Sequence, residues 1–110
     1  MTRPTPERLD DVLTACDAIA SHMLKVDAEE DLVFDAIRIR LVEIGEAVKD
    51  LDPSLLVSEP NIPWAEIARM RDLLTHRYFD TVHAIVFTTA RTDIPLLRAA
   101  IGRILADLNG

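Results

Sequence analysis

The chain has 110 residues, of which 49% are hydrophobic, and it carries a net charge of −7. This length allows one hydrophobic core and one domain, residues 1–110, and the apolar content excludes a disordered tail. No apolar run approaches the ~20 residues that cross a bilayer, and the polar N-terminus lacks a signal-peptide pattern, so we expect a cytoplasmic protein with no membrane partner. Cys16 is the single cysteine, which excludes an internal disulfide and a cysteine zinc site, and we expect it to be a small buried side chain.

The charge is distributed unevenly along the chain. Residues 1–55 hold 13 acidic and 6 basic side chains, whereas residues 56–110 hold 6 of each. An acidic protein is a poor general binder of nucleic acid, because phosphate contacts need Lys or Arg. Any RNA contact must therefore come from a local basic cluster, and the sequence offers one, formed by Arg69, Arg71, His76, Arg77 and His83.

Apolar residues that recur every three or four positions predict two helices in the first half of the chain. The first helix covers roughly residues 6–25, with Thr5 as its cap and Pro6 in its first turn. The apolar stripe of the second runs from Phe34 to Leu51, and Asp52-Pro53 stops it.

Two neighbouring residues stand out in the middle of the second helix. A glycine inside a helix lowers the stability of that helix, so Gly45 predicts a close contact with another helix. A phosphate site at Gly45 is not favoured, because no glycine-rich loop surrounds it. For Glu46, the sequence favours a solvated side chain over a salt bridge to an arginine of the basic cluster.

The second half of the chain predicts further helices. Residues 51–63 contain three prolines and form a loop, after which a helix restarts at Pro63. Residues 81–90 are rich in β-branched side chains, which favour a strand. A single strand would have no partner in this chain, so we predict a helix there. A last helix begins near Asp93 and Pro95 and reaches Leu108. The chain is therefore predicted to be an all-α bundle of four to five helices.

One stretch of the helix that restarts at Pro63, MRDLLTHRYFD at residues 70–80, gathers the reactive side chains. At 100° per residue, Arg71, Asp72, Thr75 and His76 share one polar face. Asp72 and His76 form an i, i+4 pair, and the Arg71 fork can reach a phosphate lodged over Asp72 and Thr75. Such a face suits phosphodiester cleavage, with histidine moving protons and arginine stabilising charge. A solvated helix face with an ordinary Asp–His pair has the same spacing.

Three segments of the chain, LVEIGEAVKDL, IPWAEIARMRDLLTHRYFD and IPLLRAAIGRIL, resemble the HepT-like branch of the HEPN superfamily. These small helical ribonuclease toxins are encoded beside a minimal nucleotidyltransferase antitoxin. The similarity runs from about residue 29 to residue 108 and is densest in the pattern R-x4-H-x-Y, which is Arg71, His76 and Tyr78 here.

The resemblance implies that Arg71 and His76 are catalytic and that the partner enzyme attaches AMP to Tyr78. The position after the arginine, often asparagine in these proteins, is Asp72 here. Its charge lowers affinity for RNA or, by pairing with His76, favours the protonated imidazole. Family members are similar in forming two-fold dimers with a composite cleft, and that cleft would bring two basic clusters to one RNA strand.

These observations predict a HEPN-like homodimer that acts as a metal-independent endoribonuclease toxin, using attack by the 2′-hydroxyl of the RNA. We expect Asp72 and Thr75 to support catalysis and Arg69 and Arg77 to contact RNA. No cofactor or metal is expected, because His22 and His83 lack carboxylate or cysteine partners at ligand spacing. The alternative is a catalytically silent helical module that dimerises and binds a nucleotidyltransferase. For Trp64, the sequence favours a contact in the core or in a dimer over a base-stacking platform. For the dimer, we expect Trp64 and the apolar residues near 82–87 to be free to bury a second surface.

Overall fold

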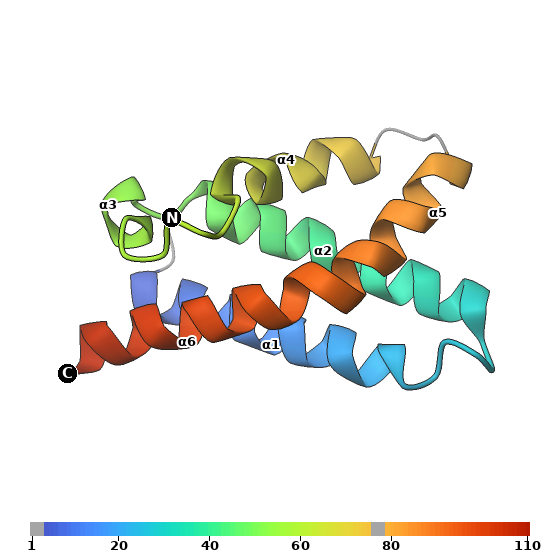
Figure 1. The fold of residues 1–110 in the computed structure, drawn as a ribbon, viewed down its shortest axis with the longest axis horizontal. Coiled ribbons are helices and arrows are strands. Elements are labelled where there is room, and N and C mark those ends of the chain that lie inside the picture. The colour runs from blue at the N-terminus through green and yellow to red at the C-terminus, as the bar shows by residue number, and fades with distance from the viewer. Residues whose placement is uncertain (1–3, 76–78) are drawn as a thin grey trace.

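The structure, a computed structural model, describes residues 4–75 and 79–110, and every regular element in those ranges is helical. Figure 1 shows α1 and α6 side by side in one layer, with α2 and α4 stacked beside each other above them. The elements in chain order are α1 (Thr5–Met23), α2 (Glu30–Lys49), α3 (Pro53–Leu56), α4 (Trp64–Thr75), α5 (Phe79–Thr88), the π-helical turn η1 (Thr89–Asp93) and α6 (Ile94–Asn109). The predicted all-α class is confirmed. In the described ranges, no helix combines the length and apolar character needed to cross a membrane.

The first two helices form close to the predicted positions. α1 has Pro6 in its first turn as expected, but its N-cap is Pro4, and Thr5 is already helical. The prediction that Thr5 caps this helix is therefore wrong. The missing N–H of Pro6 falls among the N–H groups that have no partner in the first turn, so the helix can begin one residue earlier without a side-chain cap. α2 ends at Lys49, before Asp52-Pro53, as predicted.

The loop over residues 51–63 contains one short helix that the sequence analysis did not identify. The side chain of Asp52 accepts a hydrogen bond from the backbone N–H of Ser54 at 3.0 Å, which begins the single turn of α3. Asp followed by Pro is a strong start signal, but a turn of four residues is too short to show periodicity. α4 then begins at Trp64, immediately after Pro63, as predicted.

The β-branched segment over residues 81–90 is helical, which confirms that prediction. α5 continues through η1 into α6, and Figure 1 shows the three as one long, bent rod. The hydroxyl of Thr92 donates to the carbonyl of Thr88 within this wide turn. A π-helical turn of this kind inserts an extra residue and changes the direction of a helix.

The core is larger than the sequence predicted. Val86 and Phe87 of α5 are buried, and Trp64 packs against the core while its indole N–H donates to the carbonyl of Glu59 at 2.9 Å. The expectation that residues 82–87 stay free to bury a second surface is therefore wrong for Val86 and Phe87, which lie on the helix that packs against α2. The contact of Trp64 with the core agrees with one of the two places expected for it. The buried side chains lie on the predicted seams, including Val12, Cys16 and Ile19 of α1, Phe34, Ile37, Leu41, Ile44 and Val48 of α2, and Ile94, Leu97, Ile101 and Ile104 of α6.

Gly45 lies where α2 and α4 approach most closely. A Cβ at this position would come within 3.0 Å of the carbonyl oxygen of Ile67 and 3.1 Å of the amide nitrogen of Arg71. Both atoms belong to the α4 backbone, which cannot move aside as a flexible side chain can. The absence of a side chain at Gly45 therefore sets the distance between α2 and the helix that carries Arg71, as the sequence predicted.

Alanine at position 45 should destabilise the protein, whereas alanine at position 102 should stabilise it. Both glycines are inside helices, where alanine gains about 1 kcal/mol in helix propensity. At Gly102 a Cβ would meet nothing within 4 Å, so the gain is realised. At Gly45 the added atom presses on the α4 backbone, and overpacking of this kind costs about 1–3 kcal/mol. Denaturant unfolding of Gly45→Ala and Gly102→Ala measures both effects, and equal stabilisation by the two substitutions would contradict the close contact.

Candidate active site

The described part of the candidate site lies on the exposed side of the last turns of α4. Arg71, Asp72 and Thr75 are all exposed there, within five positions of one helix, as the predicted polar face requires. His76, Arg77 and Tyr78 lie outside the described residues.

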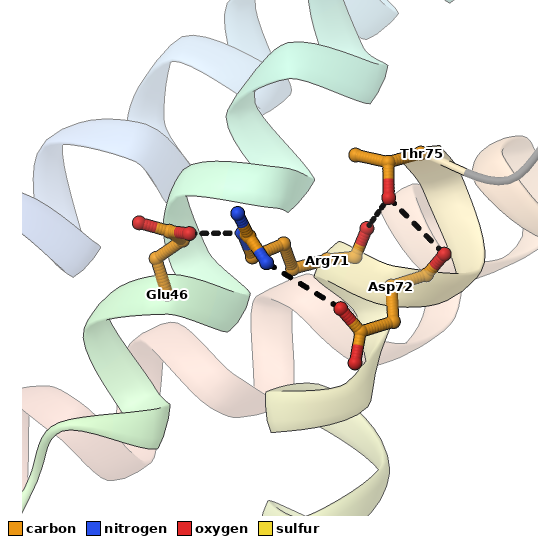
Figure 2. A network of polar contacts seen from close by, with 4 residues as sticks. All are labelled: Glu46, Arg71, Asp72 and Thr75. Carbon is orange, nitrogen blue, oxygen red and sulfur yellow. Dashed lines mark hydrogen bonds and ion pairs between the residues drawn. The ribbon is translucent and has the colours of Figure 1, made fainter.

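Arg71 is held between two carboxylates from two different helices (Figure 2). Its Nε forms an ion pair with Oε1 of Glu46 on α2, and its Nη1 lies 3.5 Å from Oδ1 of Asp72 on α4 itself. The interpretation of Glu46 as a solvated, unpaired side chain is therefore wrong. The close approach at Gly45 brings the α4 backbone next to α2, and this places the neighbouring Glu46 within reach of Arg71.

The ion pair orients the Arg71 guanidinium without burying it. About 46% of the Arg71 side chain and 54% of the Glu46 side chain remain exposed. Exposed pairs of this kind contribute about 0–1 kcal/mol, so an incoming phosphate can compete for the guanidinium at little cost. Arg71 is thus a solvent-accessible cation fixed in direction by α2, which is the property that phosphate recognition by a guanidinium fork needs.

The hydroxyl of Thr75 forms hydrogen bonds with the backbone of α4. Its hydroxyl donates to the carbonyl oxygen of Arg71 at 2.8 Å and lies 3.2 Å from that of Asp72. Figure 2 shows this side chain turned back along the helix, away from the Arg71 guanidinium. In this arrangement the hydroxyl hydrogen completes the last turn of α4, so any contribution of Thr75 to catalysis is made through the helix end.

The remaining described residues of the basic cluster have separate surroundings. Arg69 is exposed and borders a shallow hollow that Glu66, Asp72 and Leu73 also line. His83 on α5 stacks on Phe34 of α2 with ring centroids 4.8 Å apart, and its Nε2 lies 3.7 Å from Oε1 of Glu30. The structure therefore places His83 at the contact between α5 and α2.

Cys16 is buried in the core, which confirms that prediction. Burial, with a smaller effect of the nearby Asp17 carboxylate, raises the pKa of its thiol to about 12. The thiol is protonated at neutral pH and is not a candidate nucleophile. Among residues 4–75 and 79–110, no three His, Cys, Asp or Glu side chains group together in the manner of metal ligands.

Sequence comparison finds a matching family model and several similar proteins that cover most of the chain. A family model described as "Ribonuclease HepT-like" matches residues 10–104. A protein of Methanocaldococcus jannaschii named "Putative RNase MJ0125" is 38% identical over 104 residues, which cover 91% of this chain and 90% of that protein. A Thermococcus cleftensis protein named "Probable ribonuclease HepT" is 32% identical over 94% of this chain and 98% of its own length. No solved structure gives a significant match. The match to the family model over residues 10–104 and the similarity to these relatives show that the chain belongs to the HepT-like ribonuclease family.

Proposed function

We propose that this protein is an endoribonuclease toxin that cleaves RNA without a metal ion and is neutralised by a nucleotidyltransferase antitoxin. The observation that carries the proposal is the exposed Arg71 guanidinium, oriented by Glu46 on one face of α4 in a chain of the HepT-like ribonuclease family. A fixed, accessible guanidinium is suited to a phosphate that gains negative charge during reaction.

In the proposed reaction, the 2′-hydroxyl of the RNA attacks the adjacent phosphorus. His76 takes part in proton transfer, which a group with a pKa near ~6.5 can do at neutral pH. The new bond joins the 2′-oxygen to phosphorus, the bond from phosphorus to the 5′-oxygen breaks, and the leaving oxygen receives a proton. Arg71 stabilises the negative charge on the phosphoryl oxygens.

The other residues of the site have supporting roles in this proposal. Asp72 lies beside Arg71 and, as the i, i+4 neighbour of His76, is placed to influence both catalytic side chains. Thr75 donates its hydroxyl hydrogen to the α4 backbone beside Arg71, and in this proposal it supports the site through that contact. Arg69, which is exposed on the same helix, and Arg77 contact the RNA backbone.

The proposed partners are RNA, the antitoxin and a second copy of the chain. The α4 surface around Leu73 supports a two-fold homodimer, because Leu73 is 45% exposed and Glu66, Arg69 and Asp72 line the hollow beside it. A two-fold axis places the same patch on both sides, so the exposed Leu73 of one copy can pack against that of the other. This contact would bring the two α4 helices, and hence the two Arg71 side chains, toward one cleft.

Sedimentation should show a dimer at micromolar concentration, and Leu73→Glu should shift it to monomer. A two-fold axis brings the two copies of position 73 toward each other, so the substitution replaces an apolar contact by two like charges. Leu24→Glu is the matched control, because Leu24 is 88% exposed at the far end of α1 and the same change there should leave the dimer intact. A parent chain that sediments as a stable monomer would contradict the composite cleft.

The purified chain should cleave RNA equally well with and without EDTA, because a His/Arg site needs no divalent ion for proton transfer or charge stabilisation. The fragments should end in a 2′,3′-cyclic phosphate or a 3′-phosphate, as attack by the 2′-hydroxyl requires. End-group analysis of the fragments distinguishes the mechanisms. Fragments with a 3′-hydroxyl, or loss of activity on chelation, would overturn the proposal.

A further inference from the structure

The side chain of Arg38, on α2, contacts the backbone near the end of α4. Its Nη1 donates to the carbonyl oxygen of Leu74 at 2.7 Å, joining α2 to α4 across 36 positions of sequence. The bond is partly buried, and Leu74 itself is buried. A guanidinium donating to a carbonyl oxygen is a charge-assisted hydrogen bond, stronger than one between neutral groups.

The Leu74 carbonyl belongs to the last described turn of α4, one turn beyond Arg71. A carbonyl oxygen has two lone pairs, so it can accept this bond whether or not it also takes part in helical hydrogen bonding. Thr75 donates to the carbonyls of Arg71 and Asp72 from the same turn. Side chains from α2 and α4 therefore hold this turn, and His76 follows Thr75 directly in the sequence.

α2 thus holds the end of α4 at two positions. Glu46 contacts the side chain of Arg71, and one turn further along α4, Arg38 contacts the backbone of Leu74. We propose that Arg38 is a positioning residue for RNA cleavage, which holds the α4 turn from Arg71 to Leu74 in place against α2 and thereby sets the placement of the Arg71 guanidinium. This inference rests on the catalytic role proposed for Arg71.

The chain offers two matched controls for Arg38. Arg8 on α1 makes the same kind of bond at another helix end, where its Nη1 donates to the carbonyl oxygen of Asp50 after α2 at 2.9 Å. Arg40 lies two positions from Arg38 on α2 and pairs with Glu43 at 3.4 Å on the surface. Arg8→Met reproduces the loss of a helix-end bond away from the site, and Arg40→Met reproduces the loss of one positive charge from the same helix.

The experiment measures kcat and KM for cleavage of a labelled RNA that the parent chain cuts, together with thermal unfolding of each variant. Arg38→Met should lower kcat by about 10- to 100-fold, because a small misplacement of catalytic groups has effects of this size, and should change KM by less than about threefold. Arg8→Met should lower the unfolding midpoint without this loss in kcat, and Arg40→Met should change neither. Arg38→Lys should recover part of kcat, because an ammonium group can donate to the same carbonyl.

Unchanged kcat in Arg38→Met, or an equal kcat loss in Arg8→Met, would overturn the positioning role. If Arg38→Met does not fold, Arg38→Gln decides the question, because its shorter, uncharged side chain does not reach the Leu74 carbonyl as arginine does, and parental kcat in a folded Arg38→Gln would contradict the positioning role. Arg71→Ala in the same series separates this inference from the proposed function. Full activity of Arg71→Ala would overturn both, whereas full activity of Arg38→Met alone would overturn only the inference about Arg38.

Discussion

Arg71→Ala should lower kcat for RNA cleavage by about 10²- to 10³-fold, the usual cost of removing a group that stabilises charge in the transition state. His76→Ala should lose about 10²- to 10⁴-fold, as expected for a residue that transfers protons. Arg71 is exposed and its ion pairs are solvated, so the alanine variant should unfold at nearly the same temperature as the parent. Single-turnover cleavage of a labelled RNA, with thermal unfolding as the check on folding, measures these effects.

Arg69→Ala is the control for this prediction, because it removes the same charge from the same exposed helix. A residue that only contacts the RNA backbone contributes to binding, so its loss should raise KM and weaken the salt dependence while kcat stays within a few-fold. Arg71→Lys should also lose most of kcat, because an ammonium group cannot make the two parallel hydrogen bonds of a guanidinium. Folded Arg71→Ala and His76→Ala proteins that still cut RNA at the parental rate would show that the site is misassigned.

The helices of this protein were predictable because their seams alternate steps of three and four residues. The stripe from Phe34 to Val48 in α2 is buried as the pattern requires, and Pro63 and Pro95 stand at the starts of α4 and α6. The pattern of apolar residues within one helix does not predict burial that depends on which helices pack together. Val86 and Phe87 were expected outside the core, and only the packing of α5 on α2 buries them.

The candidate site shows the same division between local and tertiary information. The polar face with Arg71, Asp72 and Thr75 follows from spacing along α4. The Glu46 pairing depends on the register of α2 against α4, which one sequence does not provide, although the adjacent Gly45 was a signal that the helices approach there. Arg38 had no such signal, because its partner is a backbone carbonyl that any residue at position 74 would supply.

The ion pairs of Arg71 with Glu46 and Asp72 affect how RNA cleavage could be controlled. Glu46 and Asp72 already offset part of its charge, so the electrostatic attraction for RNA at this site is modest. One added negative group nearby would offset this attraction further and weaken RNA binding. Tyr78, two residues beyond His76, is the position at which the family resemblance implies that AMP is attached.

Tyr78→Phe should keep RNA cleavage at the parental rate yet escape neutralisation by the partner nucleotidyltransferase when ATP is supplied. AMP on the phenolic oxygen would add bulk and at least one negative charge two residues beyond His76 in the sequence, and phenylalanine lacks the oxygen that accepts it. The chain contains a single tyrosine, so AMP found on tyrosine in the parent can only be at Tyr78. Cleavage assays after incubation with the antitoxin and ATP, together with mass spectrometry of the peptide that contains position 78, measure both consequences. Thr75→Val is the control, because it removes a neighbouring hydroxyl that donates to the backbone of α4 and should leave AMP attachment unchanged. If Tyr78→Phe is silenced as fully as the parent, or if the neutralised parent carries no AMP on that peptide, the antitoxin acts by covering the cleft instead.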